Sequence, residues 1–195
     1  MRLKKLFAPN LFVALLHYPV INKNGNTIAS AVTNLDLHDI SRVAKTYGVR
    51  GFYVVTPLTD QQALIRRIVS HWVCGVGSRY NPKRRAALEL IRIKTALDDV
   101  IDHIKAKEKA MPVTVVTAAD RKRMNGQQEI GFCRFRAMLK EERVYLLIFG
   151  TGWGLSEKIL ARADYLLEPV SGRTGYNHLS VRSAASIILD RLMGQ

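Results

Sequence analysis

Glycine residues gather in a short segment directly after an apolar run in the last quarter of the chain. The run Val144–Phe149 leads into residues 150–154, which read GTGWG. Glycine allows positive φ and close backbone approach, so such a loop can present N–H and C=O groups to a flat or polar ligand. It can equally be a tight strand-to-helix connection without a ligand. The spacing departs from the dinucleotide fingerprint G-x-G-x-x-G, and the chain contains no G-x-x-x-x-G-K-[ST] phosphate loop.

Two further apolar runs end in loops of the same kind. Val113–Thr117 leads into a polar, basic segment, and Tyr165–Leu167 leads into a loop that closes with YNHLS at residues 176–180. In open α/β sheets, ligands bind beyond the carboxyl ends of the strands. The loops after Thr117, Phe149 and Leu167 are therefore the places where a ligand is expected.

The charge balance favours a polyanionic partner. The 195 residues include 30 Lys and Arg against 16 Asp and Glu, a formal charge of +14. Such a balance is typical of nucleic-acid binding, although charge runs can also be solvated faces. Because no RNA-binding signature motif is present, we expect recognition by shape and phosphates. The candidate phosphate contacts are Arg79, Lys83, Arg84, Arg85, Arg121, Lys122 and Arg123.

Other functional classes find little support. Cys74 and Cys133 lie among apolar residues and fit no metal-ligand spacing, which predicts two buried, reduced thiols and a cytoplasmic setting. The histidines are scattered, so no metal is predicted. The apolar run near the N-terminus is short and is followed by His17 and Pro19 without a cleavage site. No apolar run is long enough to span a bilayer, so no membrane partner is expected.

Strand-like and helical patterns alternate along the chain. Continuous apolar runs predict buried strands at Leu11–Leu16, Gly51–Thr56, Val113–Thr117, Val144–Phe149 and Tyr165–Leu167, with a small extension at Ala29–Val32. Helices are expected after capping boxes at residues 33–36 and 59–62, from Lys83 to about Lys107, and over Phe132–Leu139, Ser156–Arg162 and Ser180–Leu192. Gly75–Pro82 is expected to be a loop. This order predicts one α/β domain over residues 1–195, with a mostly parallel sheet flanked by helices.

Three stretches carry a family resemblance. They are residues 33–55 (TNLDLHDISRVAKTYGVRGFYVV), 145–156 (YLLIFGTGWGLS) and 176–192 (YNHLSVRSAASIILDRL). In this order they are similar to blocks of the SPOUT superfamily of S-adenosylmethionine-dependent RNA methyltransferases, and most to a bacterial branch of it. The sequence departs from the usual blocks at Asp36, where Asn is common, at His178, and at Arg182, which enters a stretch that is commonly small and apolar.

The resemblance implies a C-terminal trefoil knot that holds S-adenosylmethionine. Three knot loops would converge on the cofactor: Thr117–Asp120, Gly150–Gly154 and Glu168–Ser180. The implied cofactor-binding residues are Thr117, Ala118, Gly150, Thr151, Gly152, Trp153, Gly154, Leu167, Glu168, Pro169, Tyr176, Asn177, Leu179 and Ser180. Leu167 and Leu179 would bury the adenine. The resemblance also implies a homodimer in which the second subunit completes the site for the target base.

The candidate catalytic residues each have a structural alternative. Arg42 should face away from the core, where it contacts RNA or polarises the target, or is a solvated helix charge. Asp36 is a base for a ring nitrogen or a helix cap. Asn177, with Tyr176, orients the methionine moiety or the target, or shapes its loop.

Two residues beside the expected cofactor site also have two interpretations. Trp153 can stack on a base or anchor a dimer interface. Glu168 can bind an amine or a ribose hydroxyl, or simply end a strand. The sequence as a whole predicts an S-adenosylmethionine-dependent methyltransferase that acts on tRNA or rRNA. The alternative is a non-catalytic RNA-binding protein that retains the knotted fold.

Overall fold

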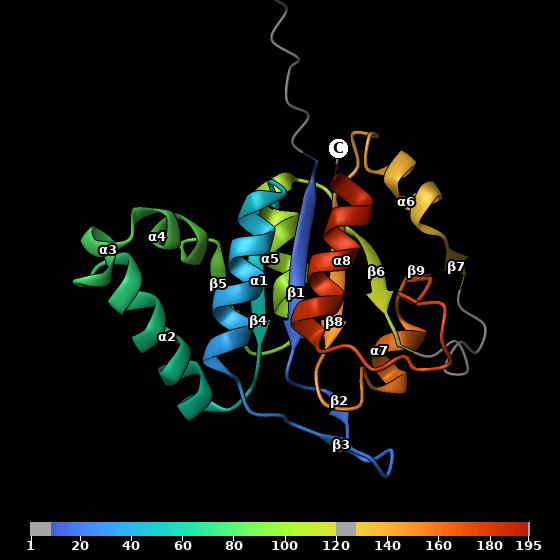
Figure 1. Ribbon diagram of the computed structural model, residues 1–195, viewed down its shortest axis with the longest axis horizontal. Coiled ribbons are helices and arrows are strands. Elements are labelled where there is room, and N and C mark those ends of the chain that lie inside the picture. The colour runs from blue at the N-terminus through green and yellow to red at the C-terminus, as the bar shows by residue number, and fades with distance from the viewer. Residues whose placement is uncertain (1–8, 120–127, 195) are drawn as a thin grey trace, which may run out of the picture.

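A parallel sheet forms the centre of the computed structural model, which describes residues 9–119 and 128–194 (Figure 1). Its seven strands lie in the order β5-β4-β1-β8-β6-β9-β7, and every neighbouring pair is parallel. The strands are β1 (Leu11–Leu16), β4 (Phe52–Val55), β5 (Ile91–Lys94), β6 (Val113–Thr117), β7 (Glu129–Ile130), β8 (Tyr145–Gly150) and β9 (Tyr165–Leu167). An antiparallel pair, β2 (Val20–Ile21) and β3 (Thr27–Ile28), stands apart from this sheet.

Helices cover both faces of the sheet. One face packs against α1 (Asn34–Thr46), α2 (Thr59–Val73), α4 (Pro82–Leu88), α6 (Phe132–Met138) and α8 (Val181–Met193). The other packs against α5 (Leu97–Glu108) and α7 (Glu157–Ala161). The short α3 (Gly77–Tyr80) joins α2 to α4. This arrangement confirms the predicted α/β class with a parallel, helix-flanked sheet.

Strand β1 shows why the strand runs are apolar without alternation. Leu11, Val13 and Leu15 pack into the core on the face of α1 and α8, and the residues between them face α5 and α7. All six side chains of β1 are fully buried. A strand between two helical layers has no solvent face, so neither set of alternating positions can be polar.

Helix α1 begins as its sequence predicts. The Thr33 hydroxyl accepts a hydrogen bond from the Asp36 N–H at 3.1 Å, which is half of a capping box. The Asp36 carboxylate instead turns toward α8. Gly48 follows the helix with φ of +72°, a conformation that glycine adopts without steric cost.

The predicted long helix from Lys83 to Lys107 is wrong. The Asn81 side chain and Pro82 start α4, which ends at Leu88, and the chain then forms β5 before α5 begins. The segment IRIK at residues 91–94 pairs in parallel with β4 at the edge of the sheet. Ile93 fits the apolar helical stripe that includes Leu90 and Leu97, and it also fits a strand in which it alternates with Ile91, so the helical pattern favoured the wrong element.

Smaller differences concern caps, the first loop and the cysteines. Helix α2 has Leu58 at its N-cap without a side-chain cap, and Gln62 donates to the Thr56 carbonyl instead. The extension expected at Ala29–Val32 does not form, and β2 and β3 precede it. Cys74 and Cys133 are exposed, because one ends α2 and the other lies on the outer side of α6. Across residues 9–119 and 128–194, no helix is long and apolar enough to cross a bilayer.

Candidate active site

The three loops predicted to hold a ligand leave the sheet side by side. Strands β8, β6 and β9 are neighbours, and the register pairs Val116 with Ile148 and Thr117 with Leu167. The loops after these strands therefore start at adjoining positions on one edge. The chain beyond β9 then returns along that side of the molecule to α8 (Figure 1). Asp120 and the basic residues Arg121, Lys122 and Arg123 lie outside the described residues.

The glycine loop binds mainly to the protein itself. The Trp153 N–H donates to the Ile21 carbonyl and the Ile21 N–H donates to the Gly154 carbonyl, both at 3.0 Å. The Thr151 N–H donates to Leu16, and the Gly154 N–H donates to Thr151. In the part of the chain that the structure describes, the Gly152 amide alone among these four has no partner. Of the glycines expected to offer backbone groups to a ligand, Gly154 therefore uses both its N–H and its C=O within the protein.

Close backbone approach explains the need for glycine in this loop. A Cβ on Gly152 would lie 3.0 Å from the Ile21 carbonyl oxygen, and φ there is +61°. A Cβ on Gly150 would lie 2.7 Å from the Leu155 nitrogen. Both positions face the protein, so a side chain at Gly152 would push against β2.

A buried chain of polar groups lies beneath the glycine loop. The Thr151 hydroxyl donates to the Leu16 carbonyl at 3.0 Å and shares a 2.5 Å hydrogen bond with the Ser30 hydroxyl. Ser30 in turn lies 3.0 Å from Nδ1 of His17. If Ser30 donates to Thr151, His17 must carry its proton on Nδ1. Its Nε2 has no partner among the described residues.

Burial controls the protonation of His17. The side chain is fully buried at the carboxyl end of β1, and this burial lowers its pKa to about 4. The charge of Asp36 and the Ala31 carbonyl oppose that shift. His17 is therefore neutral at physiological pH. Sequence reasoning missed its role, although a polar residue at the end of a fully apolar strand was a usable signal.

The third loop, residues 168–180, is open. Residues 171–180 are all exposed, including Tyr176 and Leu179. Within the described residues, the backbone from Pro169 to Leu179 forms no hydrogen bond with other backbone. The Asn177 side chain donates to the Ala119 carbonyl at 2.8 Å, which joins this loop to Ala118–Ala119 after β6. The third loop therefore carries the backbone groups that the glycine loop does not offer.

Three of the implied cofactor residues have structural partners. Leu167 was expected to cover the adenine, but its side chain is buried in the core and offers no surface to a ligand. The Thr117 hydroxyl donates to the Ile148 carbonyl at 3.1 Å. The Glu168 carboxylate accepts the Phe132 N–H at 2.6 Å, at the start of α6. Trp153 is largely exposed.

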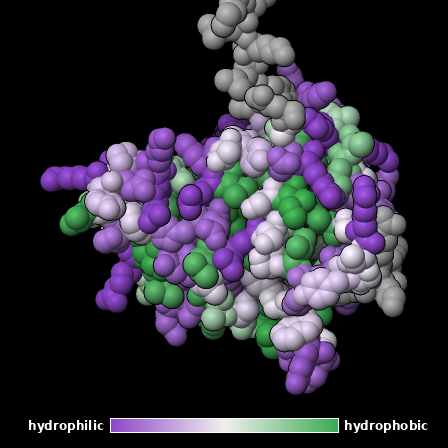
Figure 2. Space-filling model, viewed as in Figure 1, coloured by the Kyte–Doolittle hydropathy of each residue, from purple (hydrophilic) through white to green (hydrophobic). Residues whose placement is uncertain are grey.

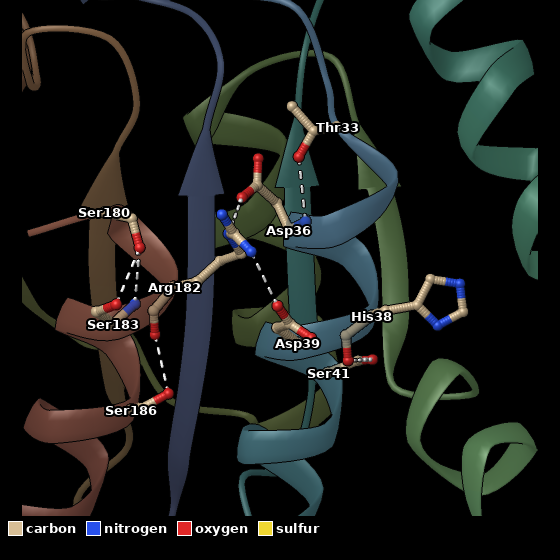
Figure 3. Close-up of polar contacts among 9 residues, drawn as sticks. All are labelled: Thr33, Asp36, His38, Asp39, Ser41, Ser180, Arg182, Ser183 and Ser186. Atoms are coloured by element: carbon tan, nitrogen blue, oxygen red, sulfur yellow. Dashed lines mark hydrogen bonds and ion pairs between the residues drawn. The ribbon is translucent and has the colours of Figure 1, made fainter.

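Helices α1 and α8 meet across a cluster of charges that ends at the third loop (Figure 3). Arg182 of α8 lies 3.4 Å from the Asp36 carboxylate and 3.1 Å from that of Asp39. Asp36, a candidate catalytic base, is buried, and its carboxylate pairs with Arg182. Arg182, which stood out only as a departure from the family pattern, is thus a link between two helices.

A shallow pocket of about 480 Å³ lies between these helices. Arg42 is exposed and lines it, and its guanidinium pairs with no carboxylate among the described residues. Ser180, the last residue of the third loop, also lines it. Arg42 and the third loop therefore border one hollow. The full lining consists of Asp39, Arg42, Val43, Thr46, Ser180, Arg182, Ser183 and Ser186.

The candidate RNA contacts that the structure describes lie on α3 and α4. Arg84 stacks over the Trp72 ring at 4.5 Å, and Arg85 pairs with Glu89 at 2.9 Å. Arg79 and Lys83 form no ion pair with any described residue. Arg79 and Lys83 are thus better placed for phosphate contacts than Arg84 and Arg85.

The fold is that of SPOUT methyltransferases. The SpoU methyltransferase AviRb from Streptomyces viridochromogenes, solved with the cofactor AdoMet, superposes with a TM-score of 0.58 at 16% identity, over 98% of this chain and 60% of that one. A putative methylase family protein from Neisseria gonorrhoeae superposes with a TM-score of 0.66 at 16% identity, over 100% of this chain and 86% of that one. The predicted SPOUT-like α/β fold is confirmed, and the knot stays a prediction.

The chain itself belongs to the SAM-dependent RNA methyltransferase family, whose model matches residues 10–194. This match confirms the predicted family.

Two relatives match almost the whole chain. A tRNA (guanine-N(1)-)-methyltransferase of Nitratidesulfovibrio vulgaris is 47% identical over 188 residues, which cover 95% of this chain and 42% of the relative. An uncharacterized protein of Aquifex aeolicus is 38% identical over 186 residues, which cover 95% of this chain and 89% of the relative. The chain thus spans less than half the length of the first relative and most of the second.

Proposed function

We propose that this chain transfers the methyl group of S-adenosylmethionine to a nucleotide of tRNA. The observation that carries the proposal is the meeting of the third loop with the Arg42 pocket at Ser180, in a chain of this family. A cofactor bound by the loops would then lie beside an exposed cationic side chain. rRNA is the other target class that the family description admits.

The open third loop fits the cofactor. Among the described residues its backbone from Pro169 to Leu179 forms no hydrogen bond with other backbone, although the Tyr176 N–H donates to the Thr174 hydroxyl. The remaining donors and acceptors suit an adenine edge and a methionine carboxylate, and Leu179 offers exposed apolar surface. The Gly152 amide adds one donor, and Asn177 fixes the third loop against Ala119. When bound, S-adenosylmethionine supplies an electrophilic methyl group on a sulfonium. The residues that would hold it are Ala118, Gly152, Pro169, Tyr176, Asn177, Leu179 and Ser180.

Arg42 is the residue to which we assign contact with the RNA target. Its guanidinium can bind a phosphate or an oxygen of the target base, and so hold the nucleophilic atom in line. Asp36 is less suited to a direct role, since Arg182 occupies its carboxylate. We therefore assign Asp36 and Arg182 to positioning α1 against α8, and with it Arg42 against the third loop.

The position of the methyl group on the target is a separate matter. The name of the Nitratidesulfovibrio relative points to N1 of a guanine in tRNA, but that name describes a chain more than twice as long as the matched part. The matched part alone does not locate that activity. tRNA is therefore the first substrate to test, and analysis of the methylated product identifies the modified atom.

We further propose that the protein works in the cytoplasm as a symmetric homodimer. Exposed Leu179 directly precedes Ser180, which lines the pocket between α1 and α8, and a second subunit on that face would cover this part of the third loop. A partner would also enclose the pocket around Arg42, which is shallow in one subunit.

Transfer of labelled methyl groups in vitro tests the proposal. Purified protein is incubated with methyl-labelled S-adenosylmethionine and with tRNA or rRNA from a strain that lacks the gene. Label should enter the tRNA fraction, and Arg42→Ala should reduce the rate strongly while Lys105→Ala, a charge change outside the pocket, should not. Binding of RNA without transfer to either fraction would indicate the non-catalytic alternative.

A further inference from the structure

A helical arm formed by α2, α3 and α4 projects beyond the edge strand β5 (Figure 1). Residues 61–88 of this arm contain six Lys and Arg and no Asp or Glu. The surface of the arm that is visible on the left of Figure 2 is mainly hydrophilic, with small apolar spots toward the end of the arm. Arg85 pairs with Glu89 just beyond the segment, but the other five cations have no carboxylate within it, so the arm carries a local positive field that attracts polyanions.

The end of the arm exposes an aromatic ring among these cations. The Tyr80 side chain is 86% exposed and forms no hydrogen bond or ring contact with any described residue. Arg79 precedes it and Lys83 follows at the start of α4. A large side chain left in solvent beside unpaired cations suits a ligand that has both a flat apolar face and negative charge.

The arm holds Tyr80 on a rigid support. The Asn81 side chain accepts the Arg84 N–H at 3.0 Å, and the Asn81 N–H donates to the Gly77 carbonyl at 3.0 Å. A Cβ on Gly77 would lie 2.7 Å from the Trp72 ring, so α3 packs closely on α2. Trp72 also contacts His38 of α1 edge to face at 5.5 Å. The backbone that carries Tyr80 is therefore already ordered and loses little conformational freedom when a ligand binds.

We propose that the end of the arm binds an unpaired segment of RNA, with Tyr80 stacked on a base and Arg79 and Lys83 on the neighbouring phosphates. This proposal rests on the proposed action on RNA and names the part of the RNA that is recognised. Every base has a π-face, but a duplex keeps its base faces stacked inside. The arm should therefore prefer loops and single strands, without strong preference for sequence.

The test compares a short mixed-sequence single-stranded RNA, labelled with fluorescein, with the same RNA annealed to its complement. Tyr80→Ala should weaken single-strand binding about 5- to 150-fold, and Tyr80→Phe should keep it, because stacking needs the ring and not the hydroxyl. Tyr80→Ala should leave duplex binding unchanged. Met111→Ala, which shortens a side chain that is 59% exposed and lies outside the arm, is the control and should change neither.

Salt dependence separates stacking from charge. Tyr80→Ala should lower the affinity and leave the slope of log affinity against log salt unchanged. Lys83→Ala should reduce that slope by about 0.7, the value for one phosphate on a single strand. Equal binding by Tyr80→Ala and wild type, or equal loss on single strand and duplex, would overturn the proposal and leave the methyl-transfer assay unaffected. No binding of wild type to any RNA at low salt would remove both.

Discussion

At the residue scale, the glycine loop combines features that a ligand site and a tight turn share. The sequence singled out Gly150, Gly152 and Gly154 as either a ligand loop or a tight turn, and the structure shows close contact of Gly152 with β2 and of Gly150 with Leu155. Backbone groups without a backbone partner among the described residues lie instead in the third loop, which no glycine motif marked. A glycine motif thus indicates close backbone approach, but it does not tell whether the neighbour is a ligand or another part of the protein.

Substitution of Gly152 distinguishes these two meanings. Gly152→Ala should lower the free energy of unfolding by about 1–2 kcal/mol, because alanine is strained at φ of +61° and its Cβ meets the Ile21 carbonyl. Urea denaturation measures this change. Gly172→Ala is the matched control, since a Cβ there meets nothing within 4 Å. Unchanged stability together with lost cofactor affinity would show that the position serves the ligand.

His17 predicts a specific pH dependence of stability. Its pKa is about 4 in the folded protein and 6.5 in the unfolded chain, so between these values only the unfolded chain binds the proton. Stability contributed by the neutral ring is complete above pH 6.5 and falls as the pH drops toward 4, by about 3 kcal/mol in all.

His17→Gln should therefore flatten the dependence of unfolding free energy on pH by up to one proton, about 1.4 kcal/mol per pH unit. His38 and His103 have pKa values lowered mainly by burial and keep their own share of the slope. Denaturation between pH 4.5 and 6.5 provides the measurement, a range inside the His17 window. The exposed His71→Gln is the control, and equal slopes for both variants would contradict the assignment to His17.

At the scale of elements, the charge cluster between α1 and α8 sets the geometry of the candidate site. Arg182→Ala should reduce stability by about 1–2 kcal/mol, because it leaves the buried Asp36 carboxylate without its cation. Arg162→Ala, which breaks an exposed pair with Asp98, should cost less than about 1 kcal/mol.

A double-mutant cycle identifies the cause of that loss. Arg182→Ala and Asp36→Ala together should destabilise less than the sum of the two single changes, by at least about 0.5 kcal/mol. Additive losses would mean that the two residues do not act on one another. The same variants in the methyl-transfer assay show whether the α1–α8 contact positions Arg42.

The strands were predictable where burial forces a single pattern. Leu11–Leu16, Val113–Thr117 and Tyr165–Leu167 have the predicted bounds, because strands buried on both faces read as continuous apolar runs. Strand β5 was missed because Ile93 also lies at helical spacing from Leu90 and Leu97, and that longer helical stripe outweighed the short alternation of Ile91 and Ile93. The Arg182 link depends on a contact between helices far apart in sequence, which no local pattern encodes.

At the scale of the whole molecule, mixed dimers tell whether Arg42 acts on the cofactor of its own subunit, whose third loop borders the same pocket, or on that of the partner. If Arg42 acts on a cofactor held by the other subunit, Arg42→Ala and Asn177→Ala damage different halves of one site. Mixed dimers then retain one intact site each, and an equal mixture should recover about one quarter of the wild-type rate.

Light scattering gives the assembly state, and mass spectrometry of differently tagged subunits verifies exchange. A monomer at assay concentrations would rule out the dimer. A dimer that exchanges subunits and recovers no activity would retain the assembly and exclude the shared site.

Nucleoside mass spectrometry of RNA from a deletion strain tests whether this chain methylates RNA in the cell. One methylated nucleoside of tRNA should disappear in the deletion strain and return when the wild-type gene is restored. The gene for the Arg42→Ala variant should not restore it. The identity of that nucleoside also gives the modified atom. An unchanged set of methylated nucleosides in both tRNA and rRNA of the deletion strain would contradict the account.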